Sequence, residues 1–509
     1  MRLTNILKRS LCLCFPVVSL VMIAAPVSAL ASSDDERNAH AKQGCVRGEF
    51  KDYYLQGEGG DPPADYTGRV FKLSQDYPDK LPPKEDYPWM AIPFENGAPT
   101  DPKTYLVELL NYGLEGNVEV DFYVEDNKVR SWYSMPWMDW NSEVAADWPG
   151  TDGREFVHGL THEFDSNPKT LSTLQTRSVD TWSGAYYNDR GAFGIGQVYC
   201  DPNSPDPSAL NPDPAGLNNF ADGSYIIKLL FSTIEESELP TMKDALEWEA
   251  DIFVETEPAV RNQGPISRYE RKVQTVRLLQ IDVAVRDDRS VTGWLFGTFA
   301  YDGTQTGATV WDRMVPLGLQ WGNSPKVTYS QTCDANGNCS QEKLTEQWID
   351  EEALKELTTA PVTLDHLGFG GRLAGPVDNP QASCIGCHQT AGFPPVAILP
   401  EFSTLSSILG LDDSKTAGDH QDFRMTFYRN VSAGAVFSDS QLYSSDFSLQ
   451  LSMSLNNFVS LRCSVDVADK PKICKTLTDW ADALRAYVDN VLTFGTPGPG
   501  GAPLTPRSD

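Results

Sequence analysis

The stretch Ala382-Ser383-Cys384-Ile385-Gly386-Cys387-His388-Gln389 brings two thiols and an imidazole together within five residues. Two cysteines on one turn of backbone can add to the two vinyl groups of neighbouring haem pyrroles. The histidine that follows then lies under the iron, where its imidazole can act as the proximal ligand. Gly386 leaves room for the macrocycle against the backbone. Because the pattern occurs once, the sequence predicts one covalent haem c, held by Cys384 and Cys387 with His388 on the iron.

Two other interpretations of the cysteine pair fit less well. A thioredoxin-type dithiol opens a helix after a strand in a βαβ unit, and the surrounding sequence has no such pattern. A zinc site needs two more ligands at close spacing, whereas the next cysteine is Cys463. In residues 384–388 the chain therefore resembles the c-type cytochromes, which implies small helices around the haem and an electron-transfer function.

The N-terminus has the composition of an export signal. Arg2, Lys8 and Arg9 precede an apolar run over 11–25, and Ala29-Leu30-Ala31 is a small-x-small cleavage site. The apolar run is too short to span a membrane, and no later run approaches ~18 apolar residues. We expect residues 1–31 to be a signal peptide, and the mature chain to be periplasmic or secreted without membrane insertion.

Cysteine number agrees with an oxidising compartment. Cys12 and Cys14 lie in the signal, so six cysteines remain besides the haem pair, an even number that predicts three disulfides. The Asn-Gly turn between Cys333 and Cys339 predicts that this pair closes a hairpin. Cys463 and Cys474 are close in sequence and form a second local pair, so Cys45 and Cys200 pair by elimination.

The net charge of −29 argues against binding to nucleic acid or anionic membranes. It suits a basic redox partner protein, and it is equally typical of acidic secreted proteins.

Length and pattern predict an α+β chain in which a large antiparallel β-rich domain precedes a smaller, mainly α, cytochrome c-like haem domain. The boundaries are a loop-rich entry over 32–103, the β-rich domain over 104–341, the haem domain over 342–494 and a disordered tail over 495–509. The expected strands are 118–124, 129–135, 182–187, 192–199, 225–231, 273–285 and 292–301, and the expected helices are 342–357, 447–459 and 480–491.

Two further groups of residues have alternative interpretations. His158 and His162 could share a metal on a helix, but Gly159 weakens a helix there, so packing or a contact beside the haem is the alternative. The aromatic stretch 135–140 either fills a core corner or lines a haem or substrate pocket.

The sixth iron ligand decides between functions, because a methionine saturates the iron and favours electron transfer. Met425, 37 residues after His388, is the preferred ligand, and Met453 is the second. Either methionine could instead have only a packing role. His366 and His420 are less favoured candidates for the sixth ligand, which would give bis-histidine ligation.

A second, weaker resemblance concerns the β region. Strands around Lys228 and Gly293-Trp294-Leu295-Phe296, followed by the haem motif, resemble the β-sheet cytochromes c-prime and their hydroxylamine-oxidising relatives. That resemblance implies Lys228 as a haem cross-link; otherwise Lys228 is a strand lysine that faces solvent.

Together these features predict an exported monohaem c-type cytochrome that transfers electrons. The alternatives are a haem enzyme with an open distal site for peroxide, hydroxylamine or nitric oxide chemistry, and a β-sheet binding module with an accessory haem.

Overall fold

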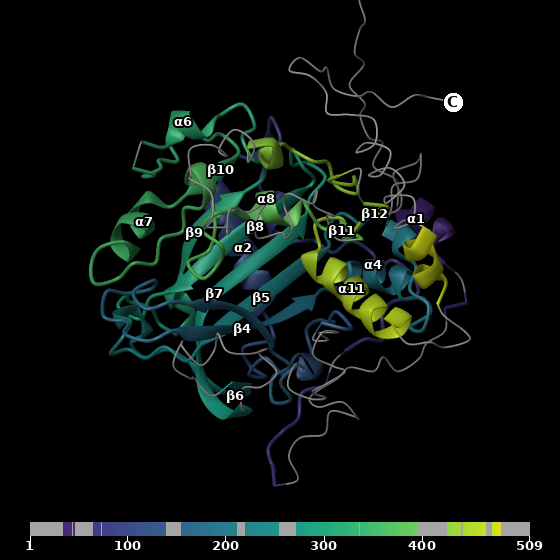
Figure 1. Ribbon diagram of the computed structural model, residues 1–509, viewed down its shortest axis with the longest axis horizontal. Coiled ribbons are helices and arrows are strands. Elements are labelled where there is room, and N and C mark those ends of the chain that lie inside the picture. The colour runs from purple at the N-terminus through teal and green to yellow at the C-terminus, as the bar shows by residue number, and fades with distance from the viewer. Residues whose placement is uncertain are drawn as a thin grey trace, which may run out of the picture. The chain divides into compact units, whose positions relative to one another are not determined.

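The longest strand, β7 (Arg271–Arg286), lies within an eight-stranded antiparallel sheet that forms the middle of the structure (Figure 1). The strand order is β10-β9-β8-β7-β5-β4-β3, and β6 also pairs with β7. The other strands are β3 (Thr161–Ser166), β4 (Val179–Tyr187), β5 (Tyr225–Ser232), β6 (Glu247–Phe253), β8 (Trp294–Tyr301), β9 (Met314–Gln320) and β10 (Gln347–Ile349). The predicted α+β class is confirmed in its large antiparallel sheet and accompanying helices.

This computed structural model describes most of the chain beyond the N-terminal segment. The described residues are 34–42, 44–45, 65–72, 74–138, 154–210, 219–253, 271–334, 336–394, 425–438, 441–464 and 471–479. The predicted signal peptide, the tail, His420 and the predicted helix over 480–491 lie outside these ranges.

The helices and short elements surround the sheet. The α-helices are α1 (Asp34–His40), α2 (Pro102–Leu114), α4 (Asp189–Val198), α6 (Tyr329–Thr332), α7 (Glu351–Leu357), α8 (Cys384–His388) and α11 (Leu449–Ser464), with a further helical stretch over 472–479. The 3-10 turns are η1 (Pro88–Ala91), η2 (Val124–Asp126), η3 (Pro207–Leu210), η4 (Pro240–Met242), η6 (Trp311–Arg313), η7 (Phe369–Gly371) and η8 (Thr426–Tyr428). Two short ribbons pair β1 (Phe94–Glu95) with β2 (Ala98–Pro99) and β11 (Gly392–Phe393) with β12 (Tyr443–Ser444).

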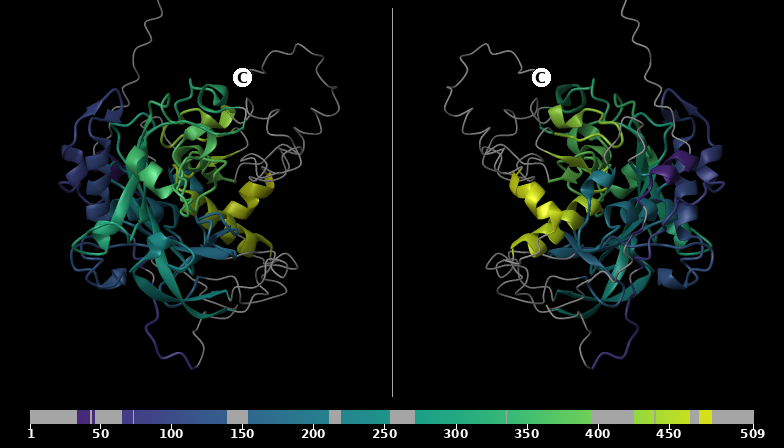
Figure 2. Two further views of the ribbon diagram at one scale, coloured as in Figure 1. Left: turned by 90° about the vertical axis from the view of Figure 1, so that its left-hand side faces the viewer. Right: turned by 90° about the vertical axis from the view of Figure 1, so that its right-hand side faces the viewer.

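Successive residues of β8 enter two different hydrophobic cores, because side chains alternate across a strand. Leu295 and Phe299 belong to the first core, which also contains the apolar face of α2. Trp294 and Phe296 belong to the second core, together with apolar residues of α4, α8 and α11. Figure 2 shows α2 and α11 on opposite sides of the sheet. The Cys-x-x-Cys-His motif over 384–388 therefore belongs to the second face.

Several strand predictions are confirmed and several are wrong. The predicted strands near 182–187, 225–231, 273–285 and 292–301 are β4, β5, β7 and β8. The β pattern expected from residue 104 is wrong, because Asp101 caps α2 through the Thr104 N–H and Tyr105, Leu106 and Leu109 form a buried helical face. Residues 118–124 and 129–135 are turns and loops with one isolated bridge at Tyr133.

The segment predicted as a strand over 192–199 is the buried helix α4. Its glycines have low helix propensity, but they let large rings approach: a Cβ on Gly194 would lie 2.7 Å from Phe220, and one on Gly196 the same distance from Tyr77. Tertiary packing decides the conformation here. The helix predicted over 342–357 is likewise only partly correct, since β10 precedes the shorter α7.

Three disulfides join the pairs that the sequence predicted, Cys45–Cys200, Cys333–Cys339 and Cys463–Cys474. The first and last residues of the 333–339 hairpin form an antiparallel bridge, and Gly337 supplies a positive φ of 84° in its turn. Three disulfides indicate an oxidising, exported compartment.

The segment predicted as the haem domain contributes directly to the sheet. Its strand β10 pairs with β9, and its helix α11 packs in the second core beside Trp294 and Phe296 of β8. All of the described residues belong to one compact unit. No helix in the described ranges combines the length and apolar character needed to cross a membrane.

Candidate haem-attachment site

The Cys-x-x-Cys-His motif forms a single short helix, α8, whose start is fixed by its own sequence. Ser383 is the N-cap, and its hydroxyl accepts the Gly386 N–H at 3.0 Å. The Cys387 N–H donates to the Ser383 carbonyl at 2.8 Å, which begins the helical turn. The side-chain carbonyl of Gln320, on β9, accepts the Ile385 N–H at 2.9 Å and ties the turn to the sheet. Cys384, Cys387 and His388 are therefore held on one turn, as attachment requires.

His388 has the arrangement of a metal-ligating histidine. Its Nδ1 lies 2.9 Å from the Phe447 carbonyl oxygen, which can only accept, so Nδ1 carries the proton and donates. Burial lowers the pKa of His388 to about 4, so the imidazole is neutral at pH 7. In a neutral ring protonated at Nδ1, the Nε2 lone pair is free to bind iron. The Phe296 ring packs against the imidazole with a centroid distance of 4.5 Å.

Cys384 and Cys387 are free thiols and half-buried, whereas the other six cysteines of the described residues are paired. Burial raises the pKa of the Cys387 thiol to about 12, and it also raises the pKa of Cys384, with Asp378 adding to both shifts. Both sulfurs are therefore protonated thiols at pH 7. Two free, reachable thiols beside a neutral imidazole fit a covalently attached haem.

Gly386 has a different role from the one that the sequence indicated. A Cβ on Gly386 would lie 2.7 Å from Cε1 of Tyr428 and 2.7 Å from the Ser383 hydroxyl oxygen. The buried Tyr428 ring occupies the space that this glycine leaves, so the glycine does not make room for a macrocycle. Tyr428 donates its hydroxyl to the Gln381 carbonyl at 3.1 Å.

The candidate sixth ligands lie in different surroundings. Met425 is half-buried at the N-terminal end of η8, three residues before Tyr428, so its segment packs beside α8. Met453, on α11, is 51% exposed and points away from the second core. His366 is fully buried, near the first core residue Leu364. Met425 remains the preferred prediction, and no contact in the described residues assigns it to the iron.

The other residues singled out in the sequence belong to packing. His158 is buried against the Tyr123 ring, while His162 lies on β3 and its Nε2 is 3.5 Å from Asp180, so the two histidines do not share a helix. No group of three or more metal-ligating side chains occurs in the part of the chain that the structure describes. Met135, Trp137 and Met138 belong to the second core, with Trp137 edge-on to Phe458 at 5.3 Å.

A charged row on the same sheet face was missed by sequence reasoning. Lys228 on β5 is the register partner of Asp282 on β7, and the Lys228 ammonium lies 3.0 Å from Glu163 of β3. Asp378, in the loop before α8, approaches Asp282 through the side chain of Gln280. Lys228 is thus ion-paired, not a free solvent-facing lysine. The available signal was the polar pair Gln280 and Asp282 inside the longest apolar strand.

Comparison of the chain with protein-family models, with curated proteins and with solved structures gave no match. The arguments for function therefore rest on the site itself.

Proposed function

We propose that this chain is an exported monohaem c-type cytochrome that transfers electrons. The observation that carries the proposal is the geometry of His388, whose Nδ1–H is bound by the Phe447 carbonyl while its neutral ring leaves Nε2 for iron. Cys384 and Cys387, free on the same turn, would hold the haem through two thioethers. The bound haem would supply a one-electron couple.

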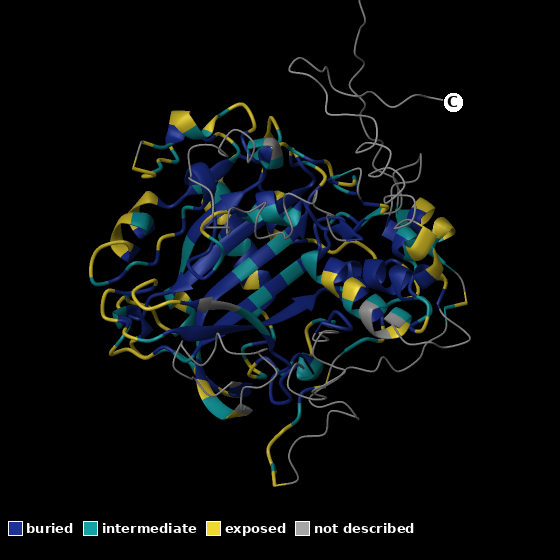
Figure 3. Ribbon diagram, in the orientation of Figure 1, coloured by how far each residue is buried: buried dark blue, intermediate teal, exposed yellow. Residues whose placement is uncertain are grey.

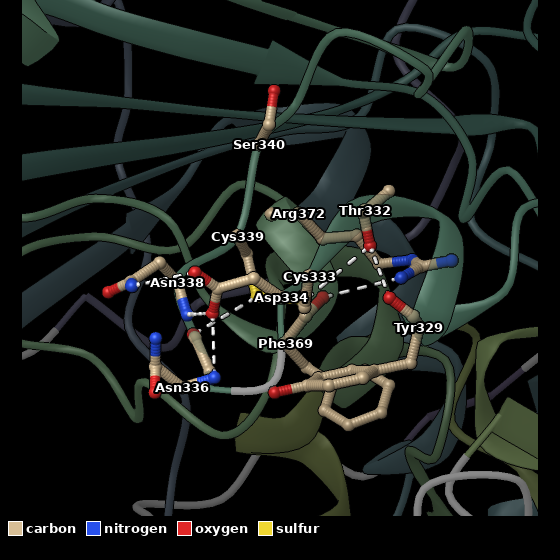
Figure 4. Close-up of a disulfide and its surroundings, with 12 residues drawn as sticks. Tyr329, Thr332, Cys333, Asp334, Asn336, Asn338, Cys339, Ser340, Phe369 and Arg372 are labelled. Carbon is tan, nitrogen blue, oxygen red and sulfur yellow. Dashed lines mark hydrogen bonds between the residues drawn. A yellow bond between two sulfur atoms is a disulfide. The ribbon is translucent and has the colours of Figure 1, made fainter.

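A ladder of aromatic rings supports electron transfer over catalysis. Tyr428 contacts Gly386 of the motif and stacks on Phe369 at 4.5 Å with an interplanar angle of 10°. Phe369 in turn lies 5.1 Å from the half-exposed Tyr329, next to the Cys333–Cys339 loop (Figure 4). The Arg372 guanidinium lies 4.8 Å over the Tyr428 ring and donates to backbone carbonyls, which fixes the ladder. The rings form a packed path from the motif toward the surface.

The setting of the protein follows from charge and cysteines. Three disulfides favour an oxidising compartment, and the signal peptide predicted over residues 1–31 favours export to the periplasm or beyond. A net charge of −29 favours a basic protein as redox partner, since opposite charge speeds association.

The test of this proposal is covalent haem. After expression in a host that matures c-type cytochromes, denatured protein should retain one haem per chain through extraction with acidic organic solvent. Replacing Cys384 and Cys387 with Ala should abolish retention. The matched control replaces Cys333 and Cys339 with Ala, a second local cysteine pair, and should retain the haem. Colour that is extracted from the unmodified protein would overturn the proposal.

A haem enzyme is the second candidate, because a specific observation favours it. The half-exposed row of Glu163, Lys228 and Asp282 lies on the sheet face that carries the motif, where charged groups could move protons for a bound substrate. An enzyme needs an open coordination position. Rapid binding of carbon monoxide to a five-coordinate ferrous haem would favour this candidate over the electron carrier.

A further inference from the structure

Two carboxylates on the motif side of the sheet share one amide donor. Nε2 of Gln280 lies 2.8 Å and 3.0 Å from the two carboxylate oxygens of Asp282, and 3.3 Å from Oδ2 of Asp378. Oδ2 of Asp378 also accepts the Gly375 N–H at 2.8 Å, and the side-chain Oε1 of Gln280 accepts the Val377 N–H at 3.1 Å. A single side chain thus holds the loop before α8 against β7 with the two acids facing each other.

The close approach is built into the loop. A Cβ on Gly375 would lie 2.0 Å from Nε2 of Gln280 and 2.5 Å from Oδ2 of Asp378, so a larger residue there would displace these two side chains. Like charges on either side of one donor disfavour double ionisation.

The charges around Asp282 do not balance at full ionisation. Lys228 is its register partner on β5 and is already paired with Glu163 of β3, while Asp378 faces it from the loop before α8. Thr298, the partner on β8, is uncharged, and Cys384 on α8 is a protonated thiol. Three carboxylates therefore meet one ammonium. Burial and then Asp378 raise the pKa of Asp282 to about 7, while Lys228 opposes the shift.

The two acids interact electrostatically with residues of the motif. Asp378 and Asp282 both raise the pKa of Cys384, and Asp378 also acts on His388. Such interactions are mutual, so an electron placed at the motif must raise the proton affinity of Asp282. Asp282 is half-buried, so part of its side chain still meets solvent, which can supply the proton; Figure 3 shows half-buried positions crossing the central strands.

We propose that Asp282 takes up one proton when the haem held at Cys384, Cys387 and His388 is reduced, which makes the protein a carrier of coupled electrons and protons. The inference rests on the proposed function. The iron gains one electron from a reducing partner protein, the Asp282 carboxylate gains one proton from water, and the charge of the site is unchanged. Oxidation releases both.

The experiment is a spectroelectrochemical titration of the haem-loaded protein between pH 5 and pH 9. Above neutral pH the ionised Asp282 opposes the added electron, so the midpoint potential should fall as pH rises, by at most about 59 mV per tenfold change in proton concentration. The midpoint potential of Asp282→Asn should not depend on pH, should equal that of the wild type at pH 5, and should be higher than that of the wild type at pH 9 by up to about 118 mV, a hundredfold change in the reduction equilibrium. Asp302→Asn is the control, a buried acid after β8 that caps a turn in which Asn also fits, and it should keep the wild-type slope.

Each outcome has a defined meaning. A midpoint potential that is independent of pH in the wild type overturns the inference. A pH-dependent potential that persists in Asp282→Asn also overturns it, because another group then takes up the proton. A pH-indicator dye should also report one proton taken up per haem reduced in the wild type and none in Asp282→Asn. If the purified protein holds no covalent haem, the proposed function is wrong, which is a different result from a wrong inference about Asp282. A haem spectrum like that of the wild type shows that the variant has folded.

Discussion

His388 donates its Nδ1–H to the carbonyl of Phe447, 59 residues later in the chain, at 2.9 Å. Phe447 precedes α11 and has a positive φ of 65°, an uncommon conformation for a non-glycine residue. The contact therefore joins the motif to the entrance of α11 and sets the imidazole orientation from outside the motif. A histidine oriented in this way would be preorganised to bind the iron of the proposed haem.

The first prediction concerns iron coordination. If Met425 is the sixth ligand, the haem should be six-coordinate and low-spin in both redox states, with a weak far-red band in the oxidised spectrum. Met425→Ala should convert the iron to high spin, because the thioether is lost. Met453→Ala is the matched control, since that side chain is 51% exposed on α11, and it should leave the spectrum unchanged. Low-spin iron in Met425→Ala would contradict the assignment.

The second prediction concerns Gly386. The new methyl of Gly386→Ala would meet both the Tyr428 ring and the Ser383 hydroxyl at 2.7 Å, so overpacking should destabilise the protein by about 1–3 kcal/mol. Urea unfolding measures the loss. Removing the ring in the double variant with Tyr428→Ala should make the two changes non-additive, because the residues are in contact. Strict additivity would show that the ring does not occupy this space.

Sequence reasoning found the elements whose signals are local. The alternation of β7, the Asn-Gly hairpin and the CxxCH turn depend on neighbours within a few residues, so they could be identified. The helix α4 could not, because its glycines fold as a helix only when Tyr77 and Phe220 pack against them. Asp282 and Asp378 are 96 positions apart, and only the packing of the loop before α8 against β7 brings them together. No local sequence pattern could therefore predict this pair.

The third prediction compares the disulfides. Cys45–Cys200 spans 155 positions, whereas Cys333–Cys339 spans six, and a longer closed loop restricts the unfolded chain more. Replacing both cysteines with Ala should cost about 4–5 kcal/mol for the long loop and about 2–3 kcal/mol for the short one. Denaturant unfolding of the two double variants measures the difference. Equal losses would mean that native-state contacts, not loop entropy, decide the effect.

The last prediction concerns acid stability. Burial lowers the pKa of His158 to about 4, against about 6.5 in an unfolded chain. Between these values the unfolded state binds more protons, so the free energy of unfolding should fall as pH drops from about 6.5 to about 4, by up to about 1.4 kcal/mol per pH unit. His158→Gln should remove this part of the slope, measured by urea unfolding at a series of pH values. The control is His40→Gln, an exposed histidine on α1, which should leave the slope unchanged. An unaltered slope in His158→Gln would mean that the ring is charged in the folded protein, contrary to its packing against Tyr123.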